Sequence, residues 1–235
     1  MYGSIVLLPL FMQDLLNFPA VTTGVWNSPR GVATMAMMPI AGYLISKRWD
    51  MRGLLTVGAV VSGIGAYMFS YLNSNVGPWG FFWPQIVMGA GLSFMFVPLA
   101  TITVDPIPQE EMGYATSLIA LARNLGAGIG ISSFAAFVTR RGQFHQVRLA
   151  ASMTANHSLP SVISVLRGYL VQQGESFARA AGQALALIYH QLLQQAATLS
   201  YLDGFRVMAI LLFIAVPFIW IMKKPQFKSP GEGAT

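Results

Sequence analysis

The sequence contains no cysteine and very little charge. The absence of cysteine excludes disulfide bonds, thiolate metal sites and a cysteine nucleophile. Charged residues make up 9% of the 235 residues and hydrophobic residues 54%, whereas about 25% of the residues in a soluble domain are charged. Such a composition is typical of a membrane protein. The net charge of +6 therefore indicates loops that face anionic lipid head groups rather than a nucleic-acid surface.

Motifs of enzyme chemistry are also missing. The chain has no HExxH, no GxSxG and no Walker loop. Its three histidines, His145, His157 and His190, are far apart, and none has a carboxylate at ligand spacing. We therefore expect neither an enzyme nor a metal site, and we interpret the imidazoles as surface groups. No basic segment precedes the first apolar run, so we expect no cleavable signal peptide.

Long apolar runs dominate what is present. Residues 205–222, FRVMAILLFIAVPFIWIM, carry one charge and are followed by two lysines. A run of about 18 apolar residues can cross a bilayer as a helix, because the backbone groups in lipid must pair within their own segment. Six such spans are predicted, at about residues 2–16, 25–45, 54–72, 79–104, 114–138 and 205–222. Because the chain opens inside an apolar run, we expect a missing upstream part.

The fold class predicted is all-α and polytopic, with a helical insert on the outer face. The predicted organisation is five transmembrane helices in 1–138, the insert in 139–202, the last transmembrane helix in 203–224 and a cytoplasmic tail in 225–235. Within the insert we expect Pro160 to mark off two helical stretches, 161–173 and 175–199. The second has apolar residues at a spacing of three and four, which predicts an amphipathic helix lying on the membrane or against a partner.

The charge of the loops predicts the orientation. The turn at 47–52, KRWDMR, is basic, and Lys223, Lys224 and Lys228 follow the last span. By the positive-inside bias both regions are cytoplasmic, which places both termini inside and the insert outside. Arg140, Arg141 and Arg148 then fall on the outer side, against this bias.

Ionisable residues within apolar spans are the best candidates for function. A charge in lipid costs several kcal/mol, so such a residue usually faces the bundle interior or a wet cavity. Arg123 lies deep in the fifth span, whereas Arg30 lies nearer the end of the second. For both, the alternative is a structural arginine bonded to carbonyl groups or reaching the interface. Asp14 and Asp203 lie near the outer ends of their spans, where ordinary interface positions are an alternative. The substrate- or proton-path candidates are Arg123, Asn124, Arg30, Asp14, Gln13 and Asp203.

A glycine-rich stretch follows Arg123. Gly126 and Gly130 share one helix face, and small residues there let helices approach closely. We interpret them as helix-packing positions, with a hinge as the alternative. No strand precedes this stretch, so the glycines do not indicate a nucleotide site.

Three motifs in order resemble one family of transporters. The segment LLPLFMQDLL followed by GVWNSPRGVATMAMMPIAGYLISKRWDMR resembles the second half of the fourteen-helix drug:proton antiporters of the EmrB/QacA type, in the major facilitator superfamily. SLIALARNLGAGIGIS and QQAATLSYLDGF are similar to two further motifs of that family. The first segment contains a degenerate copy of the cytoplasmic gating loop, in which Ser46 replaces the family's Asp and Trp49 stands near its Gly. The residues assigned to this loop are Gly42, Leu44, Asp50 and Arg52.

The resemblance implies the C-terminal half of a proton-coupled multidrug efflux transporter, working by alternating access in a bacterial inner membrane. It implies no cofactor other than the proton gradient. The implied partners are the lipid bilayer, the missing N-terminal half, small amphipathic substrates, and a periplasmic membrane-fusion adaptor with an outer-membrane channel. The alternatives are an exporter of one endogenous metabolite and a non-transporting scaffold that binds a periplasmic adaptor.

Overall fold

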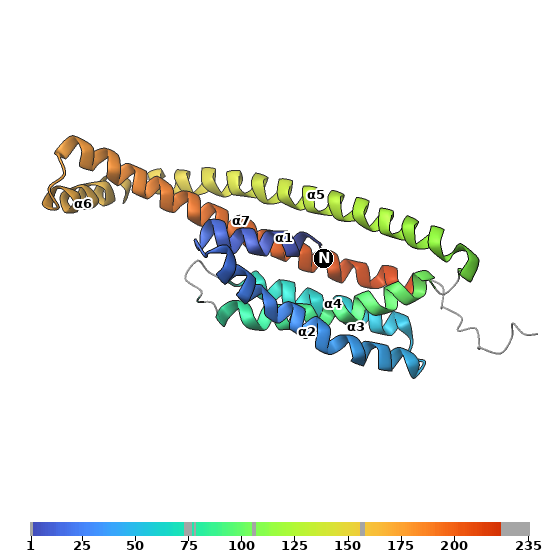
Figure 1. Cartoon of the computed structure of the whole chain (residues 1–235). Helices are drawn as coiled ribbons and strands as arrows, with labels where there is room; N and C mark the ends of the chain where they lie inside the picture. The colour runs from blue at the N-terminus through green and yellow to red at the C-terminus, as the bar shows by residue number, and fades with distance from the viewer. Residues whose placement is uncertain (1, 73–76, 78, 105–106, 156–157, 222–235) are drawn as a thin grey trace, which may run out of the picture.

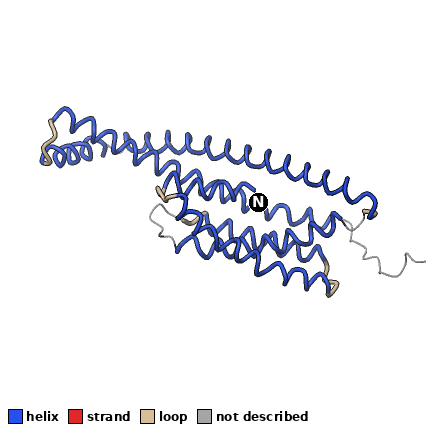
Figure 2. Tube along the Cα trace, viewed as in Figure 1, coloured by secondary structure: helices blue, strands red, loops and turns tan. Residues whose placement is uncertain are grey.

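The described part of the chain is all helical. The computed structural model describes residues 2–72, 77, 79–104, 107–155 and 158–221, and no strand occurs among them (Figure 2). The helices are α1 (Tyr2–Leu10), α2 (Ala20–Ser46), α3 (Met51–Phe69), α4 (Trp79–Val104), α5 (Met112–Ala155), α6 (Ser158–Gln172) and α7 (Phe177–Ile221), with a π-helical turn η1 (Phe11–Leu15) and a 3-10 turn η2 (Gln109–Glu111). The predicted fold class is confirmed. Lys223, Lys224, Lys228 and the tail 225–235 lie outside the described residues, as does His157.

Six helical segments make up the bundle. They are α1 with η1, α2, α3, α4, and the parts of α5 and α7 that run beside them (Figure 1). Within the described residues, α3, α4, α5 and α7 are each long and apolar enough to cross a bilayer. The α2–α3 turn, the start of α5 and the end of α7 lie at one end of the bundle, and α6 lies at the other (Figure 1). The predicted cytoplasmic turn at 47–52 and the predicted outer stretch 161–173 therefore lie at opposite ends of the molecule.

The predicted outer insert does not begin or end at a helix end. Helix α5 continues without a break for 44 residues and α7 for 45 residues, so the expected limits at 138/139 and 202/203 fall inside helices. At 1.5 Å per residue, 45 residues extend about 68 Å, more than twice the hydrocarbon core. We use the name outer rod for α6 with the parts of α5 and α7 that continue beyond the bundle.

The break between α6 and α7 lies between the two helical stretches predicted at 161–173 and 175–199, but Pro160 does not mark it. Pro160 lies in the first turn of α6, where its missing N–H costs no hydrogen bond. The chain instead turns after α6 at Gly174, whose φ of 97° is in the left-handed region. Glycine reaches that conformation without a steric penalty, so Gly174, rather than Pro160, separates α6 from α7.

One continuous buried stripe joins the outer rod to the bundle. Helix α7 buries a residue at every fourth position from its outer part to the membrane core: Ala180, Ala184, Ile188, Leu192, Ala196, Ser200, Gly204, Met208 and Leu212. Residues four apart lie on one helix face. The stripe reaches an aromatic core in which the rings of Phe69 and Phe205 stack with centroids 5.1 Å apart. Helix α7 is therefore a single element that packs both outside and inside the bundle.

Close helix contacts occur at glycines of α3 and α4. A Cβ added at Gly65 would lie 2.8 Å from the Met88 backbone nitrogen, and one at Gly58 would lie 2.8 Å from the Met95 nitrogen. At Gly126 and Gly130, in contrast, an added Cβ meets no described atom within 4 Å. The close packing predicted at these two positions is therefore absent from the described part of the chain. The reason is that this stretch of α5 stands away from the bundle (Figure 1).

Candidate functional site

An apolar cavity of about 410 Å³ opens between α2 and α4. Its size falls in the range of about 300–1,000 Å³ that is usual for small-molecule sites. The start of α1 and one side chain of α5 complete its wall. The lining residues are Ile5, Thr34, Met38, Leu92, Phe96, Leu99, Ala100, Thr103, Val104 and Arg123. The wall is thus largely aliphatic and aromatic, with two hydroxyl groups and one cation.

Arg123 supplies that cation. Its guanidinium carbon lies 5.2 Å from the centroid of the Phe96 ring, a cation–π geometry that contributes about 0.5–1 kcal/mol at an exposed site. The side chain is exposed within this chain. Arg123 is therefore part of the cavity wall. Its neighbour Asn124 is exposed and is not part of the cavity wall.

Arg30 is buried in α2, four residues before Thr34 of the cavity wall. Its carbonyl oxygen accepts a hydrogen bond of 2.8 Å from Thr34 Oγ1, which also lies 3.0 Å from the Gly89 carbonyl of α4. An added Cβ at Gly89 would overlap the Arg30 carbonyl oxygen. Glycine at 89 therefore permits the closest approach of α2 and α4, and Thr34 connects that contact to the cavity.

A buried amide pair joins the same two helices and was missed from the sequence. Gln85 of α4 is fully buried and donates a hydrogen bond through Nε2 to Asn27 Oδ1 of α2, while its Oε1 has no hydrogen-bond partner among the described residues. A glutamine within the apolar span 79–104 was the available signal. An amide in lipid needs a partner inside the bundle, which identifies such a residue as a contact between helices.

Gln13 and Asp14 lie in η1, away from the cavity wall. Gln13 is exposed, and the side chain of Asp14 is outside the described part of the structure. The π-helical turn that carries them packs on α7 and contributes Phe11 to the aromatic core. The structure therefore does not bring Gln13 to Arg123.

The predicted gating loop forms a tight turn between α2 and α3. Asp50 caps α3, because its Oδ1 accepts a hydrogen bond of 3.1 Å from the Arg52 backbone N–H. Arg48 adopts a left-handed φ of 58° after the end of α2. Gly42 and Leu44 are half-buried in the last turns of α2. The Nε of Arg52 is buried without a hydrogen-bond partner among the described residues. The loop thus has a defined structure even though Ser46 replaces the aspartate.

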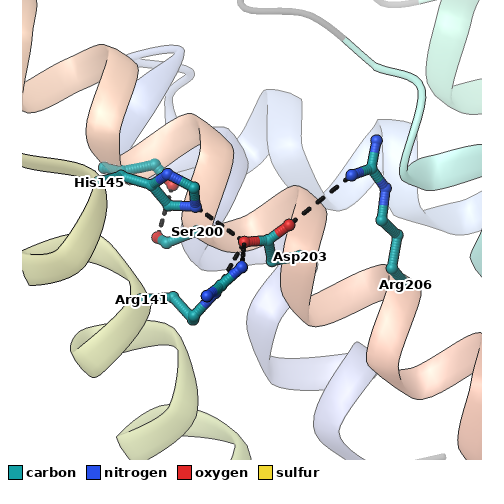
Figure 3. A network of polar contacts seen from close by, with 6 residues as sticks. Arg141, His145, Ser200, Asp203 and Arg206 are labelled. Carbon is teal, nitrogen blue, oxygen red and sulfur yellow. Dashed lines mark hydrogen bonds and ion pairs between the residues drawn. The ribbon is translucent and has the colours of Figure 1, made fainter. Parts of the chain in front are cut away.

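An ion cluster forms where α5 and α7 leave the bundle (Figure 3). Asp203 Oδ2 accepts from Arg141 at 2.8 Å from Nε and 2.7 Å from Nη2, and it lies 2.8 Å from His145 Nε2. Arg206 Nη1 lies 3.8 Å from Oδ1. The side chains of Asp203 and His145 are only 15% and 16% exposed. Asp203 is therefore the centre of a contact between helices, rather than an ordinary interface position.

Arg141 and His145 were not recognised from the sequence as partners of Asp203. Both lie on α5, four residues apart, so they share one helix face. That spacing was the available signal, but the partner is 58 or more residues away along the chain. Next to the cluster the two helices are very close: an added Cβ at Gly204 would lie 3.1 Å from Val138 Cγ2, and one at Gly142 would lie 3.6 Å from Ser200 Oγ.

Comparison of the sequence with known proteins relates this chain to a family. A sequence model of the Major Facilitator Superfamily matches residues 1–131. The chain is 29% identical over 231 residues to the fatty acid resistance protein FarB of Neisseria gonorrhoeae, covering 98% of this chain and 44% of that protein. It is 29% identical over 234 residues to the multidrug export protein EmrB of Escherichia coli (strain K12), covering 99% and 44%.

A third relative is the colistin resistance protein EmrB of Acinetobacter baumannii, 25% identical over 214 residues, which are 91% of this chain and 41% of that protein. The chain thus spans less than half the length of the curated relatives it matches. The similarity to each of these relatives extends over nearly the whole chain.

Proposed function

This chain belongs to the Major Facilitator Superfamily, and on that premise we propose that it is the C-terminal half of a proton-coupled multidrug efflux transporter. It is a multi-pass helical protein of the bacterial inner membrane. The names of the relatives, which refer to multidrug export and to fatty acid and colistin resistance, support export of amphipathic compounds. In the proposed mechanism, this half and an N-terminal half alternately open the site to either side of the membrane.

The observation that carries the proposal is the apolar cavity with Arg123 in its wall. An amphipathic compound needs apolar contacts for its body and a polar group for its head, and the cavity offers both. Its residues lie on α1, α2, α4 and α5, and α5 makes few contacts with α2 and α4. A shift of α5 relative to α4 would therefore change the wall of the cavity.

The exposed side of α5 supports a partner half. The four side chains Leu118, Leu121, Leu125 and Ile129 are all more than half exposed, and they lie in the membrane part of the helix. In the proposed transporter this face lies against lipid or the N-terminal half. We include in the proposal a tripartite arrangement, in which a periplasmic adaptor binds the outer side of the transporter. The outer rod extends beyond the bundle on that side. The proton gradient is the proposed energy source.

Substitution of Arg123 in the completed transporter tests the proposal. The chain would be co-expressed with its N-terminal half in a drug-sensitive bacterium, and efflux of a fluorescent amphipathic dye would be followed. We expect Arg123→Ala to lower efflux by about tenfold or more, because a lost charge-assisted contact costs about 1.5–3 kcal/mol. Arg123→Lys should restore part of it, because lysine keeps the charge but lacks the planar fork.

Asn124→Ala is the matched control, because it changes the next residue on the same helix without touching the cavity. Full efflux by Arg123→Ala at normal membrane expression would contradict the role of Arg123. No drug resistance from the wild-type pair would contradict the proposed function as a whole. The chain alone, reconstituted in liposomes, should show no drug-dependent proton flux.

A further inference from the structure

The hydrogen bonds of the ion cluster fix the proton on one nitrogen of His145. An ionised carboxylate can only accept hydrogen bonds. Asp203 Oδ2 lies 2.8 Å from His145 Nε2, so Nε2 carries a hydrogen and donates it. In a neutral imidazole the other nitrogen, Nδ1, is then the acceptor. Nδ1 is therefore the atom of this pair that can take up a proton.

The charged groups of the cluster around this imidazole come from two helices. Helix α5 contributes Arg141, and α7 contributes Asp203 and Arg206. Helix α3 packs on α7 and is followed by Tyr71, a titratable group without charge at neutral pH. The Tyr71 hydroxyl is hydrogen-bonded to Tyr67 at 2.6 Å.

The turn η1 also packs on α7, and it carries the exposed Gln13 and Asp14, whose side chain is not described. One anion, Asp203, thus faces two arginines and a histidine in the described part of the cluster. The histidine of α7, His190, is 13 residues from Asp203, about 20 Å along the helix axis. Arg148, three residues beyond His145 on α5, is a further cation near the cluster, with its guanidinium carbon 5.7 Å from the centroid of the Phe144 ring.

We propose that His145 is a proton-binding site on the outer side of the membrane, with Asp203 as its counter-charge and Arg141 as its competitor. This rests on the proposed antiport, in which protons enter from the outside. A proton from outer water binds Nδ1 and turns the imidazole into a cation. That cation and Arg141 then compete for the single oxygen Oδ2 of Asp203, and like charges four residues apart on one helix repel each other.

The position of the cluster connects proton binding at His145 to the cavity through α5. It lies at the close crossing of α5 and α7, beside Gly142 and Ser200. On the inner side of that crossing α5 stands away from the bundle (Figure 1) and carries Arg123 to the cavity. Arg123 and His145 are 22 residues apart on one unbroken helix, about 33 Å. A change in how α5 is held at His145 therefore moves an element that lines the cavity.

If the cluster only held α5 and α7 together, Arg141 and Asp203 would be enough and no histidine would be needed. Imidazole is the side chain whose ordinary titration falls between about pH 5 and pH 8. The proposal thus predicts an effect of outer pH that depends on His145 and survives a conservative change of Arg141. His145→Gln keeps a hydrogen-bond donor for Asp203 but cannot bind a proton, and Arg141→Lys keeps the competing charge.

The experiment uses proteoliposomes of the completed transporter, with the inner pH held constant and the outer pH varied from about 5.5 to 8. Wild type and Arg141→Lys should both show dye efflux that depends on outer pH across this range. His145→Gln should keep efflux but lose at least about half of that dependence. An unchanged pH profile in His145→Gln, with wild-type efflux present, would overturn this inference and leave the proposed function intact. Absence of efflux in wild type would contradict the proposed function instead.

A second measurement needs no transport. Cysteines at Gly142 and Ser200 report the α5–α7 crossing through the rate of disulfide formation in membranes. The rate would also be measured for the same cysteine pair in a chain that carries His145→Gln. Division of the first rate by the second removes the pH dependence of thiol chemistry. The ratio should fall by about twofold or more between pH 8 and pH 5.5. A constant ratio means that no proton on His145 acts on the crossing, and it would refute the proposal.

Discussion

The contrast between Gly58 and Gly126 predicts opposite responses to the same substitution. Gly58 lies at the α3–α4 contact, where a Cβ would be 2.7 Å from Met95 Cγ and 2.8 Å from both the Met95 nitrogen and the Phe94 carbonyl carbon. Real Cβ atoms do not approach other heavy atoms this closely. The methionine side chain can rotate away, but the two backbone atoms cannot. Gly58→Ala must therefore push α3 and α4 apart.

Overpacking of this kind costs about 1–3 kcal/mol. In a chain of this size a loss of 1 kcal/mol lowers the unfolding midpoint by about 2–4 °C, so Gly58→Ala should lower it by roughly 2–12 °C. At Gly126 no described atom lies within 4 Å of the added Cβ. Alanine there removes the helix penalty of glycine, so Gly126→Ala should be neutral or more stable by up to about 1 kcal/mol.

The assay is thermal unfolding of the purified chain in detergent micelles, followed by circular dichroism, with the two variants side by side. Equal destabilisation by both variants would refute the reasoning, because it would mean that α5 packs through Gly126 within this chain. In the completed transporter Gly126 can meet the other half, so a loss there alone would locate its contact across the two halves.

Two further predictions follow from the arrangement of the helices. A Cβ at Gly142 would lie 3.9 Å from Ser200 Cβ, inside the range of about 3.5–4.5 Å for disulfides. The pair Gly142→Cys and Ser200→Cys should therefore cross-link spontaneously and lower efflux until a reductant is added. Failure to cross-link under oxidising conditions would contradict the α5–α7 crossing. Trp49 and Tyr169 are both exposed, so a single cysteine at either position should react with an impermeant reagent. Position 49 should react from the cytoplasmic side and position 169 from the outer side. Labelling of position 169 only from the cytoplasm would overturn the topology.

The sequence alone determined the class of protein and its helices. Long apolar runs with few charges can satisfy their backbone groups in lipid only as helices, and the predicted spans 79–104 and 205–222 correspond closely to α4 and to the inner part of α7. It also marked Arg123 as a candidate for the site, because a charge deep in a span usually faces the bundle interior or a wet cavity. These inferences rely on local composition and depth, which a sequence contains.

The ends and partners of the helices were decided only in three dimensions. Polar residues 139–202 indicated a separate insert, but α5 and α7 continue through them because each supports the other along the buried stripe of α7. The glycines that allow close contact are those that face a neighbour, Gly58 and Gly65 rather than Gly126. Periodicity predicts a helix face but not what that face meets. For the same reason Asp203 could be recognised as a charge near an interface, while its partners on α5, 58 and 62 residues away, appeared only when the two helices packed together.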